Sequence, residues 1–158
     1  MGFRISETMM GTHEFHDGAG PSGRHPFGFR ARWGPDSLRD WLNPIGSRFL
    51  WQELDGELLV GGLGQRGDWV PCRGTLELLY HRGRRIRYTL DAEIDGVLHR
   101  YVGQKMNIHL HNLPVSHTTC FGTLTEVPSG RLVSTSLTTF KFRDLPRFIR
   151  TIRWAGAV

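Results

Sequence analysis

The sequence predicts an all-β protein, a closed antiparallel β-barrel of about eight strands. Residues 85–94 alternate strictly between apolar and polar side chains, the pattern of a half-buried strand. Many such short segments follow one another at near-regular spacing, with few helical signals between them. Closure would leave an interior for side chains or one small ligand, and it would remove exposed sheet edges.

Three consecutive strands are predicted in the middle of the chain. In the second of them, one face is apolar and comprises Ile86, Tyr88, Leu90, Ala92 and Ile94. The segment before it, residues 70–83, predicts a strand that ends in a tight turn around Gly83. After it, Asp95-Gly96 is a strong hairpin signal that leads into a strand over residues 97–108.

The remaining strands are predicted on both sides of this group. Residues 117–126 and 131–142 predict a hairpin around the turn 127–130. Residues 48–53 and 57–62 predict another hairpin around Asp55-Gly56. Near the start, residues 3–15 and 27–33 predict two strands joined by the glycine-rich loop 16–26.

Two helices are predicted. Residues 35–43 begin with Pro35, are followed by Pro44, and carry Leu38, Trp41 and Leu42 at helical spacing, so a short helix is expected to cover one barrel end with Trp41. Residues 143–154 predict an amphipathic helix with arginines on its polar face. The preferred role for this helix is to plug the barrel. The alternatives are contact with an anionic membrane or with a partner protein.

Length and composition narrow the class of protein. The 158 residues suit a single domain over residues 1–158. No apolar run approaches the roughly 20 residues needed to cross a bilayer, and residues 1–10 do not resemble a secretion signal, so a cytoplasmic protein is expected. Cys72 and Cys120 match no metal or redox motif and are expected to be reduced thiols.

The net charge of +5 raises the question of nucleic-acid binding. The arginines are scattered along the predicted strands and loops, and no recognised nucleic-acid-binding motif accompanies them. Neither nucleic acid nor a membrane is therefore expected as a partner.

Several short segments occur in an order that resembles a known family. They are SETMMG (6–11), GG (61–62), CRGTLELL (72–79), RRIRYTLDAEIDG (84–96), YVGQKM (101–106), HTTCFGTLTE (117–126) and SLTTFKF (136–142). Together they resemble the small accessory domain attached to cholesterol-oxidase-like flavoproteins of the glucose–methanol–choline oxidoreductase superfamily in actinobacteria. The resemblance covers most of the chain and implies a lipocalin-like or allene-oxide-cyclase-like barrel with an apolar, polycyclic ligand. No flavoprotein domain and no strand–turn–helix dinucleotide-binding unit is predicted in these residues, so no flavin chemistry is assigned and no cofactor is expected.

Residues 97–109 supply the first candidate site. Alternation puts His99, Tyr101 and Lys105 on one strand face. If that face lines the interior, Tyr101 and Lys105 are candidate catalytic groups that would polarise a carbonyl or move a proton. In the alternative, Lys105 lies outside in water and Tyr101 merely covers a barrel end. Glu7 is the third catalytic candidate, although a structural ion pair with Lys105 or Arg87 is an equal alternative.

Further side chains are candidates for ligand contact. They are Met9, Tyr88, His99, Trp41, His117 and Phe121. His109, His111 and His117 have the spacing of metal ligands, but no carboxylate accompanies them in this segment, so no metal is expected. A nucleophilic pair of Cys120 and His117 is disfavoured because residues three apart on a strand point to opposite faces.

Three functions remain open from the sequence. The preferred one is binding of a hydrophobic sterol-, lipid- or polyketide-like small molecule in the barrel lumen, in a binding or accessory role. The first alternative is a cofactor-independent cyclase or isomerase of natural-product biosynthesis, which would fold a reactive substrate inside the barrel. The second is a docking module for an oxidoreductase, with Arg147 and Arg150 in the interface.

Overall fold

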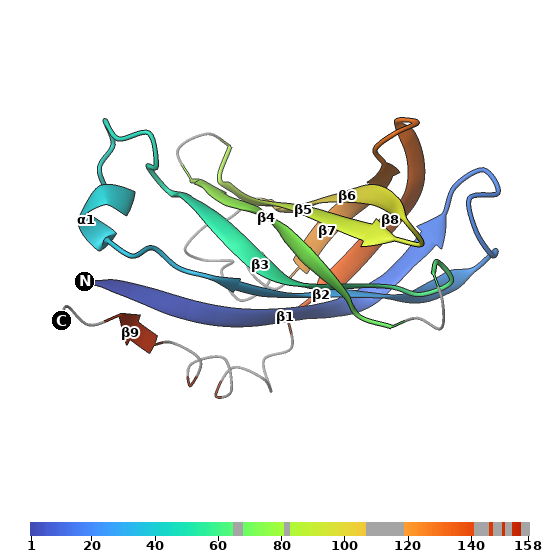
Figure 1. Ribbon diagram of the computed structural model, residues 1–158, viewed down its shortest axis with the longest axis horizontal. Coiled ribbons are helices and arrows are strands. Elements are labelled where there is room, and N and C mark those ends of the chain that lie inside the picture. The colour runs from blue at the N-terminus through green and yellow to red at the C-terminus, as the bar shows by residue number, and fades with distance from the viewer. Residues whose placement is uncertain are drawn as a thin grey trace.

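The computed structural model confirms the predicted barrel, and it describes residues 1–64, 68–80, 83–106, 119–140, 146, 150 and 153–155. The barrel strands are β1 (Gly2–Phe15), β2 (Arg24–Trp33), β3 (Trp51–Val60), β4 (Val70–Leu79), β5 (Arg85–Ile94), β6 (Val97–Lys105), β7 (Thr119–Glu126) and β8 (Arg131–Thr139). Each is antiparallel to its neighbours, and β1 pairs with both β8 and β2, which closes the barrel (Figure 1). A short strand, β9 (Arg153–Ala155), pairs with the start of β1.

The alternation predicted for β5 is confirmed by burial. Its apolar face, Ile86 to Ile94, points into the barrel, and every one of its five side chains is buried. The predicted turn into β6 is also confirmed, because Asp95 and Gly96 both have positive φ, 51° and 77°, as a two-residue type I′ hairpin requires.

The hairpin predicted at Asp55-Gly56 is wrong. Both residues lie inside the continuous strand β3, paired with β2 on one side and β4 on the other. Glycine is needed here for close approach of two strands, since a Cβ at position 56 would stand 1.8 Å from the carbonyl oxygen of Arg30. The glycine that resembles a turn signal therefore allows tight strand packing.

The first predicted helix is present but short. Helix α1 (Leu38–Trp41) begins after Ser37, whose hydroxyl accepts a hydrogen bond from the backbone N–H of Asp40. Most of the second predicted helix, 143–154, lies outside the described residues. Pro146 and Arg150 have helical backbone, but Arg153 and Trp154 belong to β9, so the predicted end of that helix is corrected. Within the described part of the chain, no helix is both long and apolar enough to cross a membrane.

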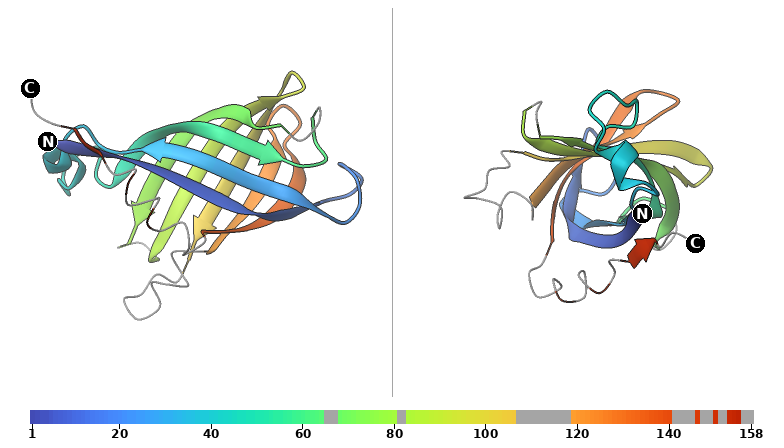
Figure 2. Two further views of the ribbon diagram at one scale, coloured as in Figure 1. Left: turned by 90° about the horizontal axis from the view of Figure 1, so that it is seen from below. Right: turned by 90° about the vertical axis from the view of Figure 1, so that its left-hand side faces the viewer.

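The two ends of the barrel differ. Helix α1, the N-terminus and β9 gather at one end, which we call the α1 end (Figures 1 and 2). Strand β6 finishes at this end, with Lys105 as its last residue. The opposite end carries the hairpin turns at 95–96 and 127–130, and we call it the turn end.

Protein side chains fill the middle of the barrel. The rings of Phe27 and Phe29 lie 4.9 and 5.7 Å from the ring of Tyr101, and all three are fully buried. Gly103 and Gly122 make room for the Tyr101 ring, because a Cβ at Gly122 would stand 2.2 Å from it. The middle of the barrel is therefore a packed aromatic core.

The outer surface holds many of the scattered arginines in ion pairs. Among the described residues the pairs are Arg4–Asp36, Arg24–Glu14, Arg30–Glu57, Arg32–Asp55, Arg87–Glu77 and Arg100–Asp91. Several join side chains that face each other on neighbouring strands, for example Arg32 with Asp55 and Arg100 with Asp91. Such cross-strand pairs favour the observed register, each by a few tenths of a kcal/mol to about 1 kcal/mol.

Candidate functional site

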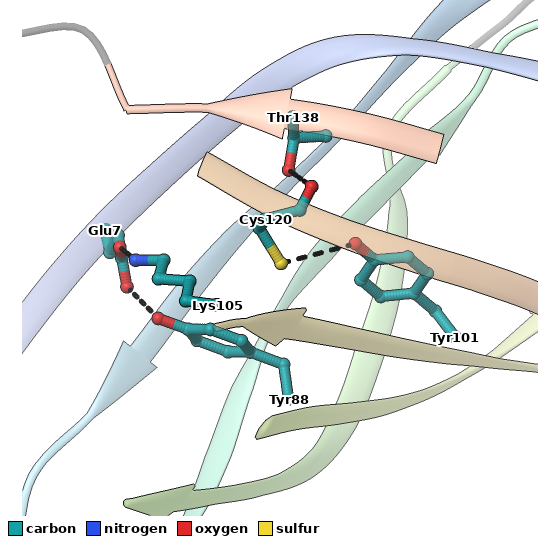
Figure 3. A network of polar contacts seen from close by, with 6 residues as sticks. All are labelled: Glu7, Tyr88, Tyr101, Lys105, Cys120 and Thr138. Atoms are coloured by element: carbon teal, nitrogen blue, oxygen red, sulfur yellow. Dashed lines mark hydrogen bonds and ion pairs between the residues drawn. The ribbon is translucent and has the colours of Figure 1, made fainter. Parts of the chain in front are cut away.

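Three polar side chains from three strands meet inside the barrel. The ammonium Nζ of Lys105 lies 2.5 Å from Oε1 of Glu7. The hydroxyl of Tyr88 donates a hydrogen bond of 2.8 Å to the other carboxylate oxygen of Glu7 (Figure 3). We call these three residues the polar cluster. Its members come from β1, β5 and β6, and only the folded barrel brings them together.

Burial dictates how the polar cluster is bonded. The side chains of Lys105 and Glu7 are only 4% and 9% exposed, so each charge requires the other as its partner. Burial, with the negative charge of Glu7 as a further cause, raises the pKa of Tyr88 well above its ordinary value. Tyr88 therefore stays protonated and keeps donating to Glu7. The Lys105 ammonium also lies 5.3 Å from the centre of the Tyr88 ring.

Tyr101 belongs to a separate set of contacts. Its hydroxyl is 3.7 Å from the sulfur of Cys120, and the hydroxyl of Thr138 donates to the Cys120 carbonyl at 3.5 Å (Figure 3). Burial raises the pKa of Tyr101 well above its usual range and that of Cys120 to about 11. Both groups are neutral near pH 7, so Cys120 is not an activated nucleophile. Of the predicted catalytic trio, Glu7 and Lys105 meet and Tyr101 stands apart.

The other predicted contact residues are dispersed. Met9 and His99 point inward and are buried, and Nδ1 of His99 lies 2.9 Å from the carbonyl oxygen of Val97. The prediction that Phe121 lines the interior is wrong: it points outward and is 56% exposed, because it alternates with the inward-facing Cys120 and Gly122. His117 lies outside the described residues.

An aromatic cluster stands at the α1 end. The Phe3 ring lies 5.8 Å from the Trp33 ring and 5.9 Å from the Trp41 ring. Trp33 is paired with Ile5, two residues before Glu7 on the same face of β1. Trp41, which the sequence predicts to cover a barrel end, is partly buried and packs against the core. Phe3 and Trp33 were not singled out from sequence, although the alternation of their strands places Trp33 on the inward face.

Two hydrogen-bond donors of the aromatic cluster lack partners. The indole nitrogens of Trp33 and Trp41 are both buried, and neither N–H has an acceptor within the described structure. Buried tryptophan usually finds a partner for this group, and leaving it unpaired costs about 1–3 kcal/mol. Each of these N–H groups is therefore suited to an acceptor supplied from outside the chain.

Cavities adjoin both tryptophans. Trp41 lines a small cavity of about 90 Å³ together with Trp51 and Gln52. Trp33 lines a wider, open cleft of about 920 Å³, and Gln52 borders this cleft as well. Gln52 is half-buried and is paired with Leu76, which in turn is paired with Tyr88 of the polar cluster.

The turn end holds a buried histidine that the sequence analysis missed. His13 is 1% exposed; its Nε2 lies 2.7 Å from the Gly61 carbonyl oxygen and its Nδ1 lies 2.9 Å from the Ser134 hydroxyl oxygen. A carbonyl only accepts, so Nε2 carries the proton and Nδ1 accepts from Ser134. Burial lowers the pKa of His13. Its inward position in the alternation of β1 was the available signal.

Metal ligation finds no support among the described residues, where no three His, Cys, Asp or Glu side chains gather. His109, His111 and His117 lie outside those residues. Cys72 and Cys120 are both buried as free thiols, as expected.

No family model, curated protein or solved structure matches this chain. The geometry of the α1 end is thus the basis for assigning a function. It combines an aromatic cluster, two unpaired N–H donors and a buried ion pair with a protonated tyrosine, all on a rigid barrel. Such an arrangement suits a ligand with flat apolar surface and an oxygen that accepts hydrogen bonds.

Proposed function

We propose that the protein binds one small, largely apolar molecule at the α1 end of its barrel, in a binding or accessory role. The observation that carries the proposal is the pair of buried indole N–H groups of Trp33 and Trp41, which have no acceptor among the described residues. A hydroxyl or carbonyl oxygen of the ligand would accept from one of them, and the three rings of the aromatic cluster would contact its apolar body.

The chemical class follows from these contacts. A sterol-, lipid- or polyketide-like molecule offers a flat or flexible apolar body with one or a few oxygens, which is also what the resemblance noted in the sequence implies. The polar cluster does not favour a highly charged ligand, because Glu7 and Lys105 already satisfy each other. The polar cluster then acts as a fixed wall beside the ligand rather than as its charge partner.

The first experiment is native mass spectrometry of the protein purified under mild conditions, followed by solvent extraction and identification of bound molecules. We expect a stoichiometric apolar adduct, or one formed after incubation with cholesterol or oleate. A clean mass after both incubations and after exposure to a polyketide extract would contradict the proposal.

A pair of variants then locates the site. Trp33→Phe keeps an aromatic ring but removes the N–H donor, and we expect it to weaken binding about 5- to 30-fold, the loss of one hydrogen bond in an apolar site. The free energy of unfolding of the ligand-free variant should not fall in proportion, because the deleted donor has no partner there. Trp69→Phe is the matched control, since Trp69 lies on the outer wall against Arg30. Equal affinities of the two variants would exclude Trp33 as the donor.

A cofactor-free cyclase or isomerase is the second candidate, and the polar cluster is the observation that favours it. A protonated tyrosine and an ammonium beside an apolar site are able to polarise a carbonyl. Recovery of an added probe in chemically changed form from the same incubations would support this candidate over simple binding.

A further inference from the structure

We propose that the α1 end docks on the surface of an anionic lipid bilayer, with the loop 42–50 as the part that enters the lipid. We call this loop the tip loop. It joins α1 to β3 and stands at the α1 end of the barrel (Figures 1 and 2). The inference does not rest on the proposed ligand, because it is argued from the exposed side chains of this end; Arg48 also lines the small cavity beside Trp41, so the vesicle test uses ligand-free protein.

The tip loop is a compact structure with fixed ends. The N–H of Leu50 donates to the Trp41 carbonyl at 2.9 Å, which closes the base of the loop. Inside it, the N–H of Gly46 donates to the Asn43 carbonyl at 3.0 Å, and the N–H of Ile45 donates to the Asn43 side chain at 3.2 Å. A loop closed in this way presents its side chains in a defined direction, as functional surface loops often do.

The tip loop exposes large apolar side chains. Ile45 is 95% exposed and Leu42 is 54% exposed, although each would gain from leaving water. Two more lie at the same end of the molecule: Met1 is 73% exposed and Trp154, on β9, is 65% exposed (Figure 2). On the barrel wall the most exposed large apolar side chain described is Phe121, at 56%. The α1 end thus concentrates the most exposed apolar groups of the described structure.

Positive charge surrounds these apolar groups. Arg39 and Arg48 are exposed on either side of Ile45 in the chain, and Arg153 is exposed next to Trp154. Residues 34–50 contain two acids: Asp36 is paired with Arg4, and Asp40 is exposed. Exposed apolar side chains with exposed arginines close to them in the chain match a bilayer with anionic headgroups, where the apolar groups insert and the arginines contact phosphates.

The shape of this surface favours lipid over a protein partner. A protein interface of standard size needs a contiguous complementary patch, whereas Ile45, Met1 and Trp154 project from three separate segments. Separate apolar side chains with tryptophan among them suit the fluid boundary between headgroups and acyl chains. The sequence analysis did not anticipate membrane contact because it weighed only the C-terminal arginines.

The test measures co-sedimentation of the ligand-free protein with vesicles of phosphatidylcholine alone and of a one-to-one mixture with phosphatidylglycerol. We expect binding to the anionic vesicles, weaker binding to the neutral ones, and a decline as salt is added. The double variant Leu42→Ser/Ile45→Ser should lower the partition coefficient by at least about tenfold. Arg39→Gln/Arg48→Gln should lower it on anionic vesicles and leave neutral vesicles unaffected.

Matched controls separate this surface from general adhesion. Leu98→Ser/Leu132→Ser removes two apolar side chains from the barrel wall that are 40% and 42% exposed, and binding should be unchanged. No binding to anionic vesicles, or equal losses in the tip-loop and wall variants, would overturn the proposal. A concentration-dependent dimer, seen by light scattering and lost in Leu42→Ser/Ile45→Ser, would also overturn it and assign the tip loop to a second copy of the chain.

Discussion

The two ends of the barrel interior bury polar groups in different ways. Near the α1 end, Lys105 and Glu7 form an ion pair across 98 positions of sequence. At the turn end, His13 bonds to Ser134 across 121 positions. The first site holds full charges that must stay together, whereas the second holds a neutral imidazole whose two nitrogens are both occupied. The barrel therefore tolerates buried polar groups when each has a partner. The charge state of each site determines which substitution or pH change destabilises the protein there.

Removal of one member of the ion pair should have the largest effect. Lys105→Met leaves the Glu7 carboxylate buried without its cation, and we expect the free energy of unfolding to fall by about 3–5 kcal/mol. Urea unfolding measures the loss. The double variant Lys105→Met/Glu7→Gln removes both charges and should recover much of it, because a neutral pair needs no counter-charge. A double variant as unstable as Lys105→Met would show that packing, rather than charge, is what the lysine provides.

Replacement of the neutral His13 should lower the free energy of unfolding by less than replacement of Lys105. His13→Leu keeps a similar volume but leaves the Gly61 carbonyl and the Ser134 hydroxyl buried without their bonds to imidazole. Each unpaired group costs about 1–3 kcal/mol, and partial relaxation should bring the total near 2–3 kcal/mol. His13→Leu/Ser134→Ala removes one of the unpaired groups and should be more stable than His13→Leu. If the two variants unfold at the same urea concentration, the hydrogen bond between Ser134 and His13 contributes nothing to the free energy of unfolding.

The fold was largely predictable because most of its determinants are local. Alternation in β5 and the turn at Asp95-Gly96 each act within a few residues, and both predictions are confirmed. The prediction at Asp55-Gly56 failed because the reason for Gly56 lies in another strand, where the Arg30 carbonyl approaches. A single sequence carries no direct record of such an approach.

The site was only partly predictable for the same reason. Alternation correctly placed His99, Tyr101 and Lys105 on one face, but nothing local indicates that Glu7 pairs with Lys105 rather than with Arg87. The closure of β1 onto β8 and β2 decides that choice, and it depends on the whole barrel. His13 was missed because a lone histidine on an apolar face resembles any core position until its partners are known.

The smallest expected difference between the two sites is in how the free energy of unfolding changes in acid. Burial lowers the folded-state pKa of His13 below 6.5, the ordinary value that the unfolded chain retains, and a second proton would have to displace the Ser134 hydroxyl from Nδ1. Below about pH 6.5 the unfolded state binds this proton first, so the free energy of unfolding should decrease as pH falls toward the folded-state pKa.

The contribution of His13 is measurable as a difference in the slope of the free energy of unfolding against pH. Urea unfolding between neutral pH and about pH 5 should show a shallower dependence in His13→Leu than in the unaltered protein, because the leucine binds no proton in either state. His16→Asn is the matched control, since His16 bonds to Thr135 on the exposed side of the barrel wall. Parallel slopes for His13→Leu and the unaltered protein would mean that His13 does not set the acid sensitivity of the turn end. Other groups would then have to explain any loss of stability in acid, and the neutral state assigned to the imidazole would lose its support.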